Sequence, residues 1–535
     1  MSEPSRLQQD SPRRRPRGLY LAILLAMIPW AILVWRFNWL CDDAYISFRF
    51  AKNLAAGHGL RFNLGAHPPV EVFSNFLWNI WMAFFEVLRL DVTVWSRVTS
   101  ILCSGALLVV VTRFAQRTFN LGFRETLFTA LFFGTLPTIA IWSTGGLESM
   151  TACLLLFLVY ERLLGDPERP HGFQAGALAI IYTLTREEAP GFIAVLLGLA
   201  VLTWFITRKK AVLKAALTVL VLLAIALTIH FTWRYAYYGD FISNTARLKA
   251  GFYWLRIERG VNYIVMLFIT VPSCLVVLLL SFLPKAVPHK LIRMQAWLII
   301  GANFVFVLQP GGDFMPMGRF LLVSMPFLTL LFAGILSGLR GRNALIAPAF
   351  TVVMVILSLL PGFNIHPVPY SIREKFDYRW VKNPVSTTEY EHWGAIKNQT
   401  ESWVRLGKAL KRRTKPGESL VIGTVGAIGY YSDLYIYDTC GLVNREVALR
   451  DTPPLRTQPG HDRAVPQSFF LKNNPTYLAV FVTVEGADQL TPELEEKWRN
   501  QPISRHIKIE RYALEPEEGF GDIGILALLR YIPPE

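Results

Sequence analysis

The sequence predicts a polytopic α-helical membrane protein, with about eleven transmembrane helices and a C-terminal extracytoplasmic α/β domain. Of the 535 residues, 53% are hydrophobic and only 17% are charged, and the mean hydropathy is +0.35, which is unusual for a soluble domain of this size. Long apolar runs fill residues 19–361, and polar sequence replaces them after about residue 362. We therefore expect a basic cytoplasmic N-terminus (1–18), a transmembrane domain (19–361) with a first outer loop at 40–94, and an extracytoplasmic domain (362–535).

The apolar runs are expected to be helices, because about 20 apolar residues are needed to cross a bilayer core of about 30 Å. The first run follows the basic SPRRRPRG segment, is too long for a typical signal-peptide core and lacks a small-residue cleavage site. It is therefore expected to be an uncleaved span that starts in the cytoplasm. The runs are 19–40, 95–112, 125–142, 147–164, 173–185, 189–207, 212–232, 261–283, 292–309, 319–337 and 344–361.

One further apolar segment, 73–90, carries Asn75, Asn79, Glu86 and Arg89 and could either span the membrane or lie at its surface. If the segment lies at the outer surface, the basic loops all fall on the cytoplasmic side with the N-terminus, as the positive-inside bias requires. If the segment spans the membrane, nearly all of these loops fall on the outer side instead. We therefore expect an interfacial helix. The formal net charge of +15 is explained by the same loops, so no nucleic-acid partner is expected. These loops are at 113–124, 162–169, 208–214, 285–293 and 340–342.

Two adjacent carboxylates, Asp42 and Asp43, follow the first apolar run, where an ionised group is costly unless it serves a purpose. The pair suggests general-base chemistry at the lipid–water boundary; the alternative is that it caps a helix or stops insertion. The predicted topology brings other polar segments to the same outer face, so an active site facing away from the cytoplasm is expected. These segments are 143–149, 185–190, 232–260 and 309–319.

The C-terminal domain is expected to mix helices and strands. SWVRLGKALKRR and TPELEEKWRN predict helices, whereas SLVIGTV, LYIYDT, TYLAVFVTV and ILALLRYI predict strands. GTVGAIG has the wrong spacing for a dinucleotide loop, and a strand followed by a tight turn is expected. The five cysteines have no paired spacing, so neither a disulfide framework nor a zinc site is predicted.

Sugar transfer outside a bacterial cytoplasm uses donors whose leaving group is a membrane-anchored polyprenyl phosphate. A protein that uses such a donor needs a slot for the lipid, cations for the phosphate and a base for the acceptor hydroxyl. The alternative role for each cation is that of an interfacial residue whose charge reaches water. The candidate cations on the outer side are Arg49, Arg186, Arg247, Lys249 and Arg319.

The loop sequence DDAYISFRFAKNLAAGHGLRFN, followed by EVFSNFLW, resembles the first outer loop of a bacterial branch of the GT-C superfamily of membrane glycosyltransferases. That branch includes the mycobacterial terminal β-(1→2) arabinofuranosyltransferase and flagellar motor control proteins. GGLES, TREEAPG, YGDFISNTARLK and GGDFMPMGRF are similar to later signatures of the branch, and IGYYSDLYIYDTCGLVNREVA is similar to its outer C-terminal domain. One departure is Glu187, which stands where the branch usually has proline.

The resemblance implies transfer from a polyprenyl-phosphate sugar, with arabinofuranose as the candidate sugar, to an acceptor hydroxyl of a cell-envelope glycan, lipid or protein, with inversion at the anomeric carbon. Either Asp42 or Asp43 would be the base, with Asp42 favoured and Asp43 orienting the acceptor or capping the following helix. Asp313 would contact substrate or pair with an arginine. Arg319, Arg186, Arg49 and Lys249 are the candidate donor-phosphate ligands, and Glu148, His58, Asn75, Asn244 and Asp313 the candidate acceptor or substrate ligands.

No metal cofactor is expected. A divalent ion held by the acid pair with His58 and His67 is the alternative, although the spacing matches no recognised ligand pattern. Two other functions remain as alternatives: a non-catalytic membrane or motor-associated scaffold on the same fold, and a lipid-linked sugar transporter, for which internal repeats would be expected. The protein is expected in a bacterial inner membrane, with membrane lipid as a further partner.

Overall fold

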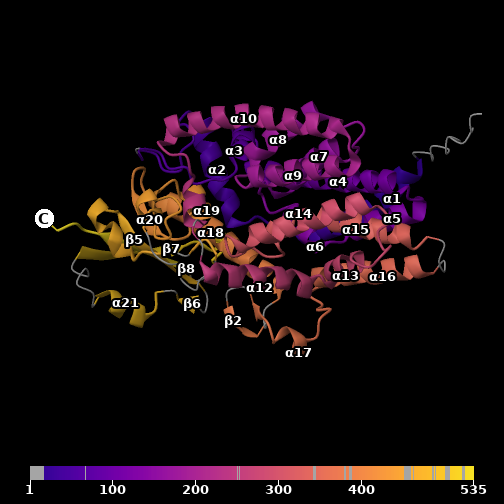
Figure 1. Ribbon diagram of the computed structural model, residues 1–535. Coiled ribbons are helices and arrows are strands. Elements are labelled where there is room, and N and C mark those ends of the chain that lie inside the picture. Colours follow the sequence, from indigo (N-terminus) through magenta and orange to yellow (C-terminus); the bar gives the residue numbers. More distant parts are fainter. Residues whose placement is uncertain are drawn as a thin grey trace, which may run out of the picture.

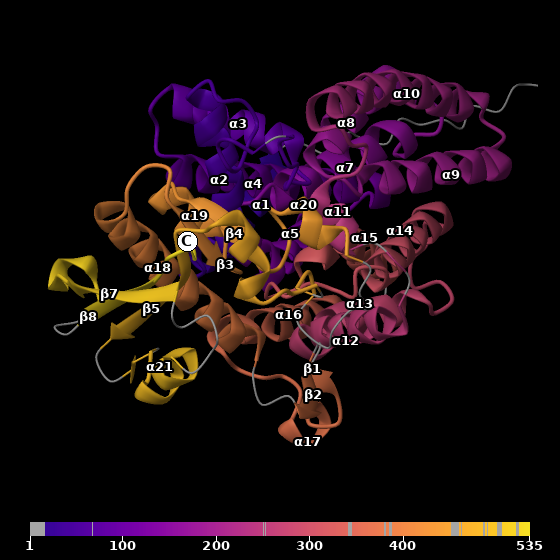
Figure 2. The same cartoon turned by 90° about the vertical axis from the view of Figure 1, so that its left-hand side faces the viewer.

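The computed structural model describes residues 17–66, 68–249, 251, 253–340, 345–378, 381–384, 388–450, 459–461, 463–484, 487–488, 490–499, 506–520 and 524–534. The chain forms a bundle of long helices that run side by side, and the mixed α/β part lies at one end of this bundle (Figure 1). Figure 2 looks at that end, with the sheet in front of the helices. The chain is a multi-pass membrane protein with a C-terminal α/β region, as predicted.

Each of the eleven apolar runs is helical. Six helices in the described part of the chain are long and apolar enough to cross a membrane, or seven if one bent pair counts as a span. The remaining four runs give shorter helices, so the number of complete crossings stays a prediction. The helices are α1 (Arg17–Arg36), α4 (Val92–Phe119), α5 (Phe123–Gly134) with α6 (Pro137–Trp142), α7 (Ser149–Leu164), α8 (Gly172–Thr185), α9 (Ala189–Thr207), α10 (Lys210–Tyr238), α12 (Trp254–Thr270) with α13 (Pro272–Ser281), α14 (Lys290–Leu308), α15 (Ser324–Gly338) and α16 (Ile346–Leu359).

Two runs expected to be single helices are broken. The helices α12 and α13 meet at a bend of 98°, and α5 ends just before the short helix α6. In both cases a proline, Pro272 or Pro137, opens the second helix. Proline lacks the backbone N–H of a helix interior and disfavours helical geometry in the residue before it, so a continuous helix is interrupted there.

The first loop folds into two helices, α2 (Asp42–Ala55) and α3 (Phe76–Val87). The acid pair opens α2 and occupies its first turn, where carboxylates are favoured by the helix dipole. The 12 residues of α3 give a length of about 18 Å, well short of a bilayer core, which favours an interfacial helix over a span. The helix α2 packs against both α3 and the C-terminal region.

The C-terminal region is built around a mixed sheet with strand order β4-β3-β5-β8-β7, and β6 pairs with β5. The strand β3 is parallel to β4 and β5, and the other pairs are antiparallel. The four predicted strands and both predicted helices are confirmed. The strands are β3 (Ser419–Ile422), β4 (Tyr435–Asp438), β5 (Tyr477–Val484), β6 (Ala487–Asp488), β7 (Ile507–Leu514) and β8 (Gly524–Tyr531), with a hairpin of β1 (Asp377–Tyr378) and β2 (Val381–Pro384) before them.

The remaining helices complete the chain. They are α11 (Asn244–Lys249) in the bundle and, in the C-terminal region, α17 (Tyr370–Arg373), α18 (Glu389–Arg413), α19 (Gly426–Ser432), α20 (Arg445–Ala448) and α21 (Pro492–Arg499), with 3-10 turns η1 (Arg319–Leu321), η2 (Leu360–Phe363), η3 (Gln467–Asn473) and η5 (Pro516–Glu518). One apolar cluster joins Phe50 of α2 to Leu420 and Ile436 of the sheet. Trp393 of α18 packs edge-on against Phe37 beside α1, with ring centroids 4.9 Å apart. The C-terminal region therefore shares its core with the bundle and the first loop.

Candidate functional site

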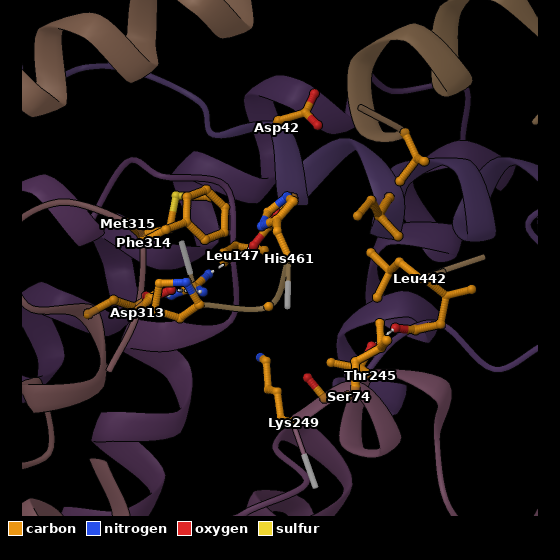
Figure 3. A pocket seen from close by; sticks show the side chains of 18 of the residues that line it. Asp42, Ser74, Leu147, Thr245, Lys249, Asp313, Phe314, Met315, Leu442 and His461 are labelled. Atoms are coloured by element: carbon orange, nitrogen blue, oxygen red, sulfur yellow. Dashed lines mark hydrogen bonds and ion pairs between the residues drawn. The ribbon is translucent and has the colours of Figure 1, made fainter. Parts of the chain in front are cut away.

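A cavity of about 370 Å³ lies where the helix bundle, the first loop and the C-terminal region meet (Figure 3). Its size is at the lower end of the range for small-molecule sites, roughly 300–1,000 Å³. The cavity is lined by eight of the eleven residues that were expected to act in catalysis, donor binding or acceptor binding: Asp42, Asp43, Asn75, Glu148, Arg186, Lys249, Asp313 and Arg319.

The two acids of the pair have different surroundings. The Asp42 carboxylate accepts hydrogen bonds from the backbone N–H groups of Gly426 (3.1 Å) and Ala427 (2.7 Å), at the start of α19. Burial raises the pKa of Asp42 to about 7, although the Ala427 amide acts in the opposite direction. Asp43 instead lies 3.3 Å from Arg319, and its side chain is 32% exposed. Asp42 thus binds the C-terminal region through its carboxylate, whereas the carboxylate of Asp43 is accessible from the cavity.

Gly426 belongs to the GTVGAIG segment, for which a strand followed by a tight turn was expected. The strand β3 ends at Ile422, and the short helix α19 begins at Gly426. A Cβ atom at this position would lie 2.5 Å from Asp42 Oδ2 and 2.6 Å from Asp42 Cγ, far inside van der Waals contact. Glycine is needed here so that the backbone can approach the carboxylate, which explains the glycine pattern without a nucleotide.

Arg319 is held by the GGDFMPMGRF loop. Its guanidinium donates to both Asp313 oxygens, with Nε–Oδ2 at 2.6 Å and Nη2–Oδ1 at 3.0 Å, and its remaining nitrogen faces Asp43. The turn requires glycine at 311 and 312, since both have positive φ angles (80° and 78°). Asp313 therefore pairs with an arginine, one of the two roles considered from the sequence, and the pair presents Arg319 to Asp43.

A second ion pair forms another part of the lining. Glu148 is buried, accepts a hydrogen bond from Asn75 Nδ2 at 2.6 Å and lies 2.5 Å from Arg186 Nη1. Arg186 also pairs with Glu188 at 2.5 Å. All three charged groups of this cluster, Glu148, Arg186 and Glu188, therefore have a partner of opposite charge within the protein.

The departure at Glu187 has a local explanation. Its carboxylate accepts a hydrogen bond from the Ser243 hydroxyl at 2.7 Å and lies 3.8 Å from Arg234. Arg234 is bound in turn to Glu71 at 2.8 Å. The acid that replaces proline thus links the segment before α9 to the end of α10 and to the first loop.

Lys249, at the end of α11, is the remaining lining cation. It points into the cavity from the end opposite Asp42 (Figure 3). Within the described residues, its ammonium group makes no hydrogen bond or ion pair; its nearest ring is that of Phe320, 5.5 Å away. Burial, and then the charge of Arg319, lower the pKa of Lys249. An anionic ligand would supply the missing partner.

Three residues expected at the site lie elsewhere. Arg49 is buried and donates to the backbone carbonyls of Phe62, Gly429 and Leu434 at 2.7–2.8 Å, so it fastens the first loop to the C-terminal region rather than lining the cavity. Burial lowers its pKa to about 10.

Asn244 has a similar structural role, since its amide donates to the carbonyls of Gly441 (2.7 Å) and Leu442 (2.8 Å). His58 is exposed and does not line the cavity. His67 lies outside the described residues. In the part of the chain that is described, no group of three His, Cys, Asp or Glu side chains is arranged to hold a metal ion.

The sequence did not point to the residues that the C-terminal region contributes to the cavity. These include Gln399 and Trp403 of α18, Thr424 after β3, and His461. The ring of His461 lies edge-on to Phe314, with centroids 5.4 Å apart. The spacing of Gln399 and Trp403 places them on one face of a helix, but nothing in the sequence indicates which face meets the first loop.

Comparison with known proteins bears on the fold. A family model described as a domain of unknown function (DUF8728) matches residues 391–515. Comparison with curated protein sequences gives no match. Among solved structures, the oligosaccharyltransferase of Archaeoglobus fulgidus in complex with zinc and sulfate has a TM-score of 0.39 at 11% identity, covering 78% of this chain and 62% of that one.

ArnT from Cupriavidus metallidurans is similar over almost the whole chain. Its complex with undecaprenyl phosphate gives a TM-score of 0.53 at 13% identity, covering 96% of this chain and 98% of ArnT. Its apo state gives a TM-score of 0.54 at 13% identity, covering 95% and 97%. This chain therefore has the fold of ArnT, which is a GT-C fold, as the sequence predicted.

Proposed function

We propose that this protein is an inverting glycosyltransferase that moves a sugar from a polyprenyl-phosphate donor to an acceptor hydroxyl. The observation that carries the proposal is the cavity itself, in which the open carboxylate of Asp43 and the unpartnered ammonium of Lys249 share one enclosed space. A base and an anion site are the two parts that such a transfer requires. The ArnT structure with undecaprenyl phosphate, on the same fold, supports a lipid-linked donor.

Lys249 is the proposed ligand of the donor phosphate. Arg186 and Arg319 also line the cavity, but each is compensated by two carboxylates. One unpartnered cation matches the single negative charge of a sugar phosphodiester. During transfer the phosphate gains a second negative charge, and a partly buried ammonium stabilises that change more strongly than an exposed one because less water screens it.

Asp43 is the proposed general base, in place of Asp42. Its carboxylate takes the proton of the acceptor hydroxyl, the acceptor oxygen forms a bond to the anomeric carbon, and the bond from that carbon to the phosphate oxygen breaks. The electron pair of the broken bond leaves with the polyprenyl phosphate. Because the acceptor attacks the face opposite the leaving phosphate, the configuration at the anomeric carbon is inverted. Arg319 orients Asp43 and is itself fixed by Asp313.

Asp42, with both carboxylate oxygens bonded to the amides of α19, is a positioning residue in this proposal. Glu148 and Asn75 are proposed to contact substrate hydroxyls at the cavity wall that they share. The site would face the outer side of a bacterial inner membrane, where lipid-linked sugars are the available donors. Arabinofuranose, the sugar of the resembling branch, is the first donor to try.

The test uses the full-length protein in lipid nanodiscs, a polyprenyl-phosphate-linked pentose or hexose, and release of polyprenyl phosphate as the readout. Asp43→Asn should lower the transfer rate by about 10²-fold or more, the usual contribution of a general base. Lys249→Ala should weaken donor binding without changing folding. Matched controls are Asp166→Asn and Lys415→Ala, since both residues are exposed and outside the cavity.

Wild-type turnover by Asp43→Asn would refute the assignment of the base. If the wild-type protein shows no turnover with any donor, and Asp43→Asn and Asp42→Asn both leave the cellular phenotype unchanged, a non-catalytic scaffold replaces the enzyme. Net movement of the donor across a sealed bilayer without transfer would identify a transporter.

A further inference from the structure

The cavity has two walls of opposite character. The wall formed by the bundle and first loop carries the charged side chains, among them Asp43, Lys249 and Arg319. The wall formed by the C-terminal region has no Asp, Glu, Lys or Arg among its described lining residues. Its polar side chains are those of Gln399, Thr424, Cys440 and His461, and the indole of Trp403 lines the same wall.

The neutral wall is built from three segments of the C-terminal region. Gln399 and Trp403 lie on one face of α18, four residues apart. Thr424 is two residues before Gly426, whose amide binds Asp42. At the other edge, His461 packs against Phe314, the residue after Asp313. The neutral wall therefore extends from Asp42 to the loop that carries Asp313.

From this division we infer that the C-terminal region provides the acceptor subsite and that the acceptor is an uncharged glycan. The inference rests on the proposed function and names the substrate class of the same site. A sugar without charge presents C–H faces that pack on an aromatic ring and hydroxyls that bond to amide and hydroxyl groups. The indole of Trp403 supplies the first kind of contact, and Gln399 and Thr424, which line the same cavity, supply the second.

An anionic acceptor fits the neutral wall poorly. A phosphate or carboxylate bound there would lose its hydration without gaining a charged partner, which is costly in an enclosed space. It would also compete with the donor phosphate for Lys249, the only lining cation in the described residues without a carboxylate partner. Separation of a charged donor wall from a neutral acceptor wall removes that competition.

The experiment measures binding to the full-length protein in nanodiscs by saturation-transfer NMR. The probes are neutral trisaccharides of arabinose, glucose, mannose and rhamnose, and matched trisaccharides that carry a phosphate or a uronic acid. We expect at least one neutral probe to bind, the charged versions to bind at least tenfold more weakly, and Gln399→Ala to weaken the neutral probe by about fivefold or more. Asn398→Ala is the control, because Asn398 is exposed on the same helix and outside the cavity.

Trp403 is partly buried, so Trp403→Phe accompanies Trp403→Ala to separate ring stacking from folding. The phenyl ring should restore most of the binding that alanine removes. Preference for a charged probe, failure of every neutral probe, or equal effects of Gln399→Ala and Asn398→Ala would overturn the inference. Binding of polyprenyl phosphate, and its loss in Lys249→Ala, is measured separately, so the proposed function can survive when the acceptor assignment fails.

Discussion

Replacement of Gly426 by alanine tests the contact on which the cavity depends. A Cβ atom there would lie 2.5 Å from Asp42 Oδ2 and would also meet the Asp42 backbone oxygen. Because a helix backbone cannot retreat as a flexible side chain does, α19 must move away from α2. The two amide hydrogen bonds to the Asp42 carboxylate would then be lost. Hydrogen bonds to a charged group contribute about 1.5–3 kcal/mol each, so docking should weaken by about 3–6 kcal/mol.

At about 1.4 kcal/mol per tenfold change, the lower figure corresponds to roughly a hundredfold loss of hydrogen-exchange protection at the amides of residues 426–428. Transfer activity should fall with it, because the neutral wall moves away from Asp43. Gly394→Ala is the matched control: Gly394 lies in α18, and an added Cβ there meets nothing within 4 Å. Unchanged protection and activity in Gly426→Ala would refute the view that this contact closes the cavity.

Three further predictions concern Asp42, Arg49 and the membrane topology. The pKa of Asp42 is raised to about 7 in the docked arrangement, so docking should tighten as the pH falls from about 7 towards 4. Protection factors of the α19 amides should rise by at most tenfold per pH unit, and Asp42→Asn should flatten the profile. Arg49→Ala should cost about 3 kcal/mol or more, since at least two charged hydrogen bonds are lost; the thermal midpoint should fall, and donor binding by the folded fraction should stay unchanged. A reporter fused after Glu535 should be active only outside the cytoplasm, and cytoplasmic activity would reverse the proposed topology.

Much of the fold could be predicted because its signals are local. Long apolar runs mark the bundle helices, and short apolar or aromatic runs mark β3, β4, β5 and β8. The strand β7, at the sheet edge, was missed because the alternation of Ile507 and Ile509 with Lys508 and Glu510 is short and is interrupted at Arg511. The bend between α12 and α13 was missed because a long apolar run outweighed its single proline.

The site was predictable where it depends on residues close in sequence. Asp42 and Asp43 stand out as acids next to an apolar run, and Asp313 lies six positions before its partner Arg319. Arg49 was misjudged because its acceptors are main-chain carbonyls, two of them about 380 positions away, and a carbonyl leaves no signature in a sequence. Gln399 and Trp403 were overlooked because only tertiary packing turns their face of α18 towards the cavity, and this packing also leaves no signature in the sequence.

The bond between Asp42 and Gly426 joins residues 384 positions apart, so the ribosome must finish most of the protein before the acid meets its amide. Until then the emerging bundle can enter the bilayer, but its acid pair faces water instead of a closed chamber. The cavity therefore forms late in synthesis, after residue 426 has left the ribosome. Ribosomes stalled before residue 426 should yield an inserted chain whose chamber lacks one side.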